Sequence, residues 1–199
     1  MKLSLLAFLT CFSSLAWAQA TTNVPSASTS KDTSHVPVTF TGGYETEGVD
    51  KGRPVILIAS ALNVPPEVFR KVFSGVKPAG PGQQPEEAQV RKNKQVLMEG
   101  LSPYGVTDDR LNEVSNYYRY RRDSGELWRH TDATAYATMR NGEVASVTIT
   151  NPGSGYSSPP RVSLPGIDQV RFKVVLAYGT DLATNGSIKE IKIKQPSEQ

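Results

Sequence analysis

The chain has 199 residues, a formal net charge of +3 and one cysteine, Cys11. This length suits one medium domain or two small ones, and so small a net charge gives no global sign of nucleic-acid binding. If the amino-terminal segment that contains Cys11 is removed, the mature chain has no thiol, no disulfide and no thiolate metal ligand. Its fold must then be stabilised by packing alone.

Residues 1–18 have the pattern of a secretory signal peptide. Lys2 gives a short positive region, an apolar run follows, and an Ala-x-Ala series ends at Ala18. Because signal peptidase cuts after such small residues, we expect cleavage after Ala18, with Ala20 as the alternative. An uncleaved membrane anchor or a buried amino-terminal helix are the rival interpretations. The pattern predicts a periplasmic or extracellular protein with no transmembrane segment once the signal is removed.

The next segment, residues 19–40, is rich in serine and threonine. Such a composition lacks the apolar surface that offsets the entropy cost of ordering a chain. We therefore predict a disordered tether between the signal peptide and the folded part.

Residues 41–128 are expected to form a helical part of three or four short helices. Pro54 suits the first position of a helix whose residues are apolar almost all round, although a buried strand is the rival over residues 55–58. The remaining helices are predicted to begin at Pro65 and Pro66, after Pro85 and at the capping residue Thr107. The helix after Pro85 should end near Leu101, and Val106 should contact Leu111 as a hydrophobic staple.

Residues 129–195 alternate between apolar and polar side chains, which is typical of strands. The dipeptides Asn141-Gly142 and Asn185-Gly186 each predict a β-hairpin. They lie 44 residues apart, and at that offset three apolar positions agree: Val144 with Ile188, Val147 with Ile191, and Ile149 with Ile193. The agreement predicts a degenerate internal repeat with the same β-bulge after each turn, with chance agreement as the alternative. The fold class is thus α+β, with a small, mostly antiparallel β part of about five strands.

Between the two hairpins stands Asn151-Pro152-Gly153-Ser154-Gly155-Tyr156. With the strand before it, this segment resembles the Gly-Ser-Gly-Tyr β-repeat of bacterial surface proteins and phage tail proteins, over roughly residues 133–165. From Gly42 onward the chain is also similar to small secreted bacterial proteins of unassigned activity. The second copy lacks the Gly-Ser-Gly-Tyr segment. The resemblance implies a structural or interaction module and no particular chemistry.

The sequence contains no recognisable catalytic motif. Its histidines are His35, in the predicted tether, and His130, and no nucleophile elbow accompanies either of them. The acidic groups around Glu47 and at Asp108-Asp109 lack the spacing of a calcium loop. We therefore predict no catalytic residue, no metal site and no cofactor.

The most distinctive local feature is a cluster of aromatic and basic residues. It comprises Tyr117, Tyr118, Arg119, Tyr120, Arg121, Arg122 and Trp128. Aromatic faces beside guanidinium groups can stack on sugars and hold anionic groups, which makes these residues candidate binding residues. The alternative is that the rings pack where the helical part meets the β part, with the arginines in solvent.

Two functions follow from these features. The first is a non-enzymatic, exported envelope or surface interaction protein, with envelope glycan or another envelope protein as its partner. The second is a glycan-active hydrolase that uses two carboxylates distant in the sequence. Nucleic-acid binding is not expected, and the sequence indicates no oligomeric state.

Overall fold

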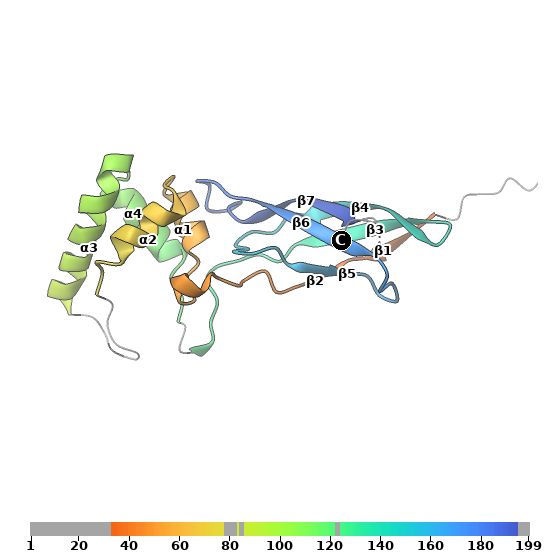
Figure 1. Cartoon of the computed structure of the whole chain (residues 1–199), viewed down its shortest axis with the longest axis horizontal. Helices are drawn as coiled ribbons and strands as arrows, with labels where there is room; N and C mark the ends of the chain where they lie inside the picture. The colour runs from red at the N-terminus through yellow and green to blue at the C-terminus, as the bar shows by residue number, and fades with distance from the viewer. Residues whose placement is uncertain (1–32, 78–82, 84–85, 122–123, 195–199) are drawn as a thin grey trace, which may run out of the picture. The chain divides into compact units, whose positions relative to one another are not determined.

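The structure is a computed structural model that describes residues 33–77, 83, 86–121 and 124–194. The predicted signal peptide, and the predicted tether as far as residue 32, lie outside the described residues. Within them the chain has four α-helices and seven strands, most of them antiparallel, and is of the expected α+β class (Figure 1). None of the described helices is long and apolar enough to cross a membrane.

The helices lie together in Figure 1 and form where the sequence predicts them. Their bounds are η1 Gly48–Asp50, α1 Val55–Ala61, α2 Pro66–Phe73, α3 Glu87–Leu101, η2 Ser102–Tyr104 and α4 Asp108–Tyr117. The helical interpretation of residues 55–58 is correct and the rival strand is not. Thr107 caps α4 as expected, since its hydroxyl accepts a hydrogen bond of 3.2 Å from the backbone N–H of Arg110.

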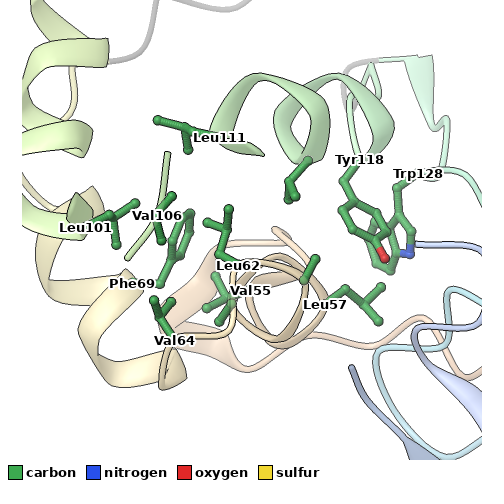
Figure 2. Packing of buried hydrophobic residues seen from close by; sticks show 13 residues of the cluster. Val55, Leu57, Leu62, Val64, Phe69, Leu101, Val106, Leu111, Tyr118 and Trp128 are labelled. Carbon is green, nitrogen blue, oxygen red and sulfur yellow. The ribbon is translucent and has the colours of Figure 1, made fainter. Parts of the chain in front are cut away.

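The helices share one hydrophobic core, drawn in Figure 2. Leu57 from α1, Leu101 from α3 and Val114 from α4 are fully buried in it. The expected staple residues Val106 and Leu111 are buried in the same cluster. Tyr118 and Trp128, also labelled in Figure 2, belong to this core. The core therefore includes the chain that follows α4 as well as the helices.

The strands form three small antiparallel sheets. The first has the order β1 (Thr33–Pro37), β3 (Thr134–Arg140), β4 (Glu143–Asn151); the second pairs β2 (Thr39–Thr41) with β5 (Arg161–Ser163); the third pairs β6 (Arg171–Ala177) with β7 (Ser187–Lys194). Two further core clusters lie among them, one around Tyr156 and Ile188 and one around Ala137 and Leu164.

The predicted tether is wrong for its last residues. Residues 33–37 form β1 against β3, and residues 39–41 form β2 against β5. Val36, Val38 and Phe40 pack against the buried clusters of the β part. The segment is poor in apolar residues, but partners supplied from about a hundred residues away pair its backbone. These two strands also explain why the β part exceeds the expected five.

The predicted β-bulge is present in both hairpins. In the first hairpin Thr138 faces Ser146 while Met139 faces Val144, so Ala145 is the extra residue. In the second, Val175 faces Glu190 while Leu176 faces Ile188, so the extra residue is Lys189. These two extra residues are 44 positions apart, the offset that the sequence predicts.

The two hairpins close differently. Asn141 and Gly142 both have positive φ, 53° and 81°, as a tight two-residue hairpin turn requires. The second hairpin is closed by the longer loop 178–186, and the predicted tight turn at Asn185-Gly186 is wrong. Asn185 lies buried at the end of that loop, where its side chain has several hydrogen-bond partners.

Candidate functional site

The Gly-Ser-Gly-Tyr segment joins the β part to the helical core. The backbone N–H of Gly155 donates to the carbonyl of Asn185 at 2.8 Å, and the indole N–H of Trp128 donates to the carbonyl of Gly155, also at 2.8 Å. Gly155 has a φ of 80°, and a Cβ placed on it would lie 2.8 Å from the carbonyl oxygen of Arg129. The glycine is therefore required both by its conformation and by the close approach of a neighbouring segment.

Asn185 also connects the β part to the helical core, and we call these connecting contacts the joint. Its side-chain amide donates to the carbonyl of Leu57 in α1 at 2.8 Å and to the hydroxyl of Tyr118 at 2.9 Å. Its amide oxygen accepts from the backbone N–H of Gly179 at 3.1 Å. Burial raises the pKa of Tyr118 to about 12, so this hydroxyl is neutral and able to hydrogen-bond at physiological pH. The amide nitrogen and oxygen of Asn185 and the Tyr118 hydroxyl thus all have hydrogen-bond partners, and this network has a structural role.

The structure divides the predicted binding cluster into two groups. Tyr118 and Trp128 are core residues, only 3% and 2% exposed. Tyr120 is half-buried, and its hydroxyl donates to the carbonyl of Gly52 at 2.5 Å. These three rings have the packing role that the sequence offered as the alternative to binding.

The other members of the cluster lie nearer the surface. Tyr117 is half-buried, whereas Arg119 and Arg121 are exposed. Arg122 lies outside the described residues. The backbone of Arg121 exchanges hydrogen bonds with Glu126, which closes the turn after α4. Of the described predicted binding residues, Tyr117, Arg119 and the buried Trp128 line the same open surface.

That surface is a depression of about 780 Å³, called the Tyr117 depression below. Its lining includes Tyr117, Arg119, Glu126, Leu127, Arg129 and His130. Leu127 is 41% exposed, an unusual degree for a large apolar side chain. Nothing in the sequence pointed to Leu127, whereas Arg129 and His130 directly follow the predicted Trp128 in the same distinctive segment.

Arg129 and Arg119 are the cations of the depression. The Arg129 guanidinium lies over the ring of Tyr117, 4.9 Å from its centroid. Arg119 donates to the side-chain oxygen of Asn116 at 3.1 Å. Among the described residues, neither arginine has a carboxylate within ion-pair distance. Both therefore present uncompensated positive charge to a ligand.

Two carboxylates line the same depression, and both already have partners. Glu113 forms an ion pair of 2.5 Å with Arg110 in α4. Glu126 accepts a hydrogen bond of 2.9 Å from the backbone N–H of Arg121. Nearby, the Nδ1 of His130 lies 2.8 Å from the carbonyl of Trp128. These hydrogen bonds and this ion pair stabilise α4 and the turn that follows it.

The acidic group around Glu47 has a structural role. The Asp50 side chain is almost fully buried, and both of its oxygens accept from Arg70 of α2, at 2.7 and 2.9 Å. Glu47 lies 3.1 Å from the same guanidinium. These carboxylates raise the pKa of Arg70 further, so the arginine stays charged and holds η1 against α2. In the described ranges no three His, Cys, Asp or Glu side chains are grouped so that they could hold a metal ion.

No protein-family model matches the chain, and no curated protein or solved structure is significantly similar to it. Function must therefore be argued from the geometry of this chain's own surface.

Proposed function

We propose that this protein is a non-enzymatic interaction protein, exported to the cell envelope or cell surface, and that the Tyr117 depression is its contact surface. The observation that carries the proposal is the Arg129 guanidinium stacked on Tyr117 beside Arg119, with no acidic partner for either arginine in the described ranges. A tyrosine ring beside guanidinium groups that have no acidic partner suits sugars with anionic substituents.

One lining residue of the depression, Trp128, is held firmly in place, which supports a binding role. Trp128 is held by its hydrogen bond to Gly155, and its ring lies 5.6 Å from that of Tyr120. Trp128 is therefore fixed before a ligand binds, and its ring loses little side-chain entropy on binding.

The partner that fits this chemistry is envelope glycan or another envelope protein. The signal-peptide pattern of residues 1–18 and the resemblance to the surface-protein repeat favour that location. The exposed Leu127 beside two arginines also suits a protein partner, because interfaces are enriched in arginine around an apolar centre.

The test is retention of the mature protein on purified cell-wall glycan and on solubilised envelope proteins. We expect R119Q/R129Q to weaken retention at least tenfold, roughly the loss of 1.4 kcal/mol or more of binding free energy. R91Q/K92Q, on the exposed surface of α3, is the matched control because it removes the same charge elsewhere. Equal retention of the two double variants would show that the Tyr117 depression is not the contact surface.

A glycan-active hydrolase is the second candidate, since Glu113 and Glu126 line one depression. It predicts release of reducing ends from cell-wall glycan, abolished by E113Q or E126Q while binding persists. A protein that binds glycan without releasing reducing ends is the outcome that the interaction role predicts.

A further inference from the structure

The β6–β7 hairpin places like charges opposite each other. In its register Lys173 faces Lys192 and Arg171 faces Lys194. All four side chains are exposed and belong to the same face of the hairpin, because the residues between them on β6, Phe172 and Val174, are partly or fully buried. Directly opposed like charges destabilise a strand pair. We call these four residues, with Arg161 on β5, the basic sheet face.

The repeat itself does not require these charges. At the offset of 44 residues, Lys192 corresponds to Thr148, and the first copy pairs Thr148 with Tyr136. The first hairpin thus builds the same bulged pair of strands with neutral side chains at this position. The second copy thus carries cations that the first copy lacks at this position, and the repulsion between these cations opposes folding. We therefore attribute to them a role outside folding.

Few carboxylates lie close enough to neutralise the positive charges of the basic sheet face. Lys192 lies 3.3 Å from Glu190. Arg161, Lys173 and Lys194 have no carboxylate within ion-pair distance in the described part of the chain, and the same holds for Arg171. Repulsion between these charges is relieved when an anion binds between them.

Three of these cations converge on a depression of about 780 Å³. Arg161, Lys173 and Lys194 line it together with Phe172, Pro159 and Pro160. Glu45 also lines it, but its carboxylate already accepts from the Ser158 hydroxyl and from the backbone N–H of Gly43. The depression therefore combines apolar surface, provided by Phe172 and two prolines, with cations from three strands.

We propose that the basic sheet face binds an acidic polysaccharide, with its anionic groups at the lysines and arginines and a sugar ring in the depression. Apolar rings beside cations suit a sugar that carries a carboxylate or phosphate. The most exposed large apolar side chains, Val49, Val90, Tyr104, Leu127 and Tyr178, all lie outside this depression, so nothing here is suited to insert into a membrane. Phe172 is the one aromatic side chain among the described residues that line the depression, whereas single-stranded nucleic acids are bound by several aromatic side chains on which successive bases stack.

The test is binding of the mature full-length protein to polygalacturonate, with neutral dextran as the uncharged control. The variant K173Q/K194Q removes one cation from each opposed pair and leaves the Lys192–Glu190 ion pair in place. Its matched control is K71Q/K92Q, which makes the same two substitutions at exposed positions of α2 and α3. We expect affinity for polygalacturonate to fall about tenfold or more in K173Q/K194Q and to stay unchanged in K71Q/K92Q. In the parent protein it should fall with rising salt.

A second readout separates binding from misfolding. Because K173Q/K194Q relieves repulsion within the hairpin, its Tm should rise by about 1–2 °C while its affinity falls. The proposal is overturned if both double variants bind equally well, if neutral dextran binds as tightly as polygalacturonate, or if anionic phospholipid vesicles or a single-stranded oligonucleotide bind more tightly. The basic sheet face shares no lining residue with the Tyr117 depression, so K173Q/K194Q should lower the affinity for polygalacturonate by the same factor in the parent protein and in an R119Q/R129Q background.

Discussion

Asn185 is the residue on which the joint between strands and helices depends. It is 1% exposed, and its amide serves the carbonyl of Leu57, the hydroxyl of Tyr118 and the N–H of Gly179. Its replacement removes the hydrogen bonds to the buried Leu57 carbonyl and the buried Tyr118 hydroxyl, and such losses are costly when no water reaches the groups.

We therefore expect Asn185→Ala to lower the free energy of unfolding by about 2–4 kcal/mol, because several buried hydrogen bonds are lost at once. Denaturant unfolding measures this. Asn112→Ala in α4 is the control, since its side chain is exposed and bonds only to exposed Asp108, and its effect should stay within about 0.5 kcal/mol. Equal losses in the two variants would show that the Asn185 network does not hold the joint together.

Glu45 makes a pH-dependent contact at the residue scale. The hydrogen bond from Ser158 is the main cause that lowers the pKa of this carboxyl below its ordinary value of 4.5, with backbone N–H groups adding to it. A lowered folded-state pKa means that the contact stabilises the fold above pH 4.5 and is lost as the pH falls through the folded-state pKa. Ser158→Ala should raise the pKa of Glu45, measurable by NMR titration of its side-chain carboxyl. An unchanged pKa would assign the shift to the backbone N–H groups instead.

At the scale of elements, the Gly-Ser-Gly-Tyr loop differs from an ordinary turn in what surrounds it. Gly155 and Gly166 have similar positive φ values, 80° and 73°. A Cβ on Gly155 would clash with the chain around Arg129 and His130, whereas a Cβ on Gly166 would meet nothing within 4 Å. Alanine substitutions at the two glycines therefore distinguish two costs. Both variants incur the cost of a side chain at positive φ, but only the Gly155 variant also incurs the cost of a steric clash.

Gly166→Ala should cost about 1 kcal/mol, the strain of positive φ in a residue with a side chain. Gly155→Ala should cost at least about 2 kcal/mol more, because the loop must also move away from residues 129–130. Thermal and denaturant unfolding of both variants provide the comparison. Similar losses would show that the contact between the loop and this segment is loose.

The element that the sequence predicted least well is the segment before residue 42. Its composition is that of a tether, yet β1 and β2 form because β3 and β5 provide paired backbone partners. Strand formation at an edge depends on such distant pairing more than on local propensity. Helices α1 to α4, by contrast, form from contacts within a few residues, and caps and prolines mark their starts in the sequence.

At the scale of the whole molecule, the helices and strands in the described part of the chain are coupled through Trp128. This side chain packs in the helical core and hydrogen-bonds to the Gly-Ser-Gly-Tyr loop. The other tryptophan, Trp17, lies in the predicted signal peptide. In the mature protein, tryptophan fluorescence should therefore report on the joint alone.

We expect the mature protein to unfold in one cooperative step. The denaturant midpoint from Trp128 fluorescence should coincide with the midpoint from far-UV circular dichroism, because the joint cannot open while both parts stay folded. A hydrophobic core and the Asn185 bonds cross between the two parts. Fluorescence that changed well before the circular dichroism signal would instead identify two independently stable parts.

The helices, the first hairpin turn and the bulge in each hairpin could all be predicted from the sequence, because each depends on residues within a few positions of one another. The sequence also marked the Tyr117 region, since aromatic and basic residues cluster there along the chain. The sequence offered two alternatives for that cluster, ligand binding and packing. The structure assigns some of its residues to the core and others to the surface.

Only the tertiary structure decided which rings are buried, that Asn185 is a buried link in place of a turn residue, and that Lys173 faces Lys192. The physical reason is the same in each case. Burial and cross-strand pairing depend on partners far away in the sequence, and a shift of one residue in register would reverse which side chains face the solvent. The basic sheet face therefore became visible only when the strands were paired in space, whereas the sequence had already indicated part of the Tyr117 depression.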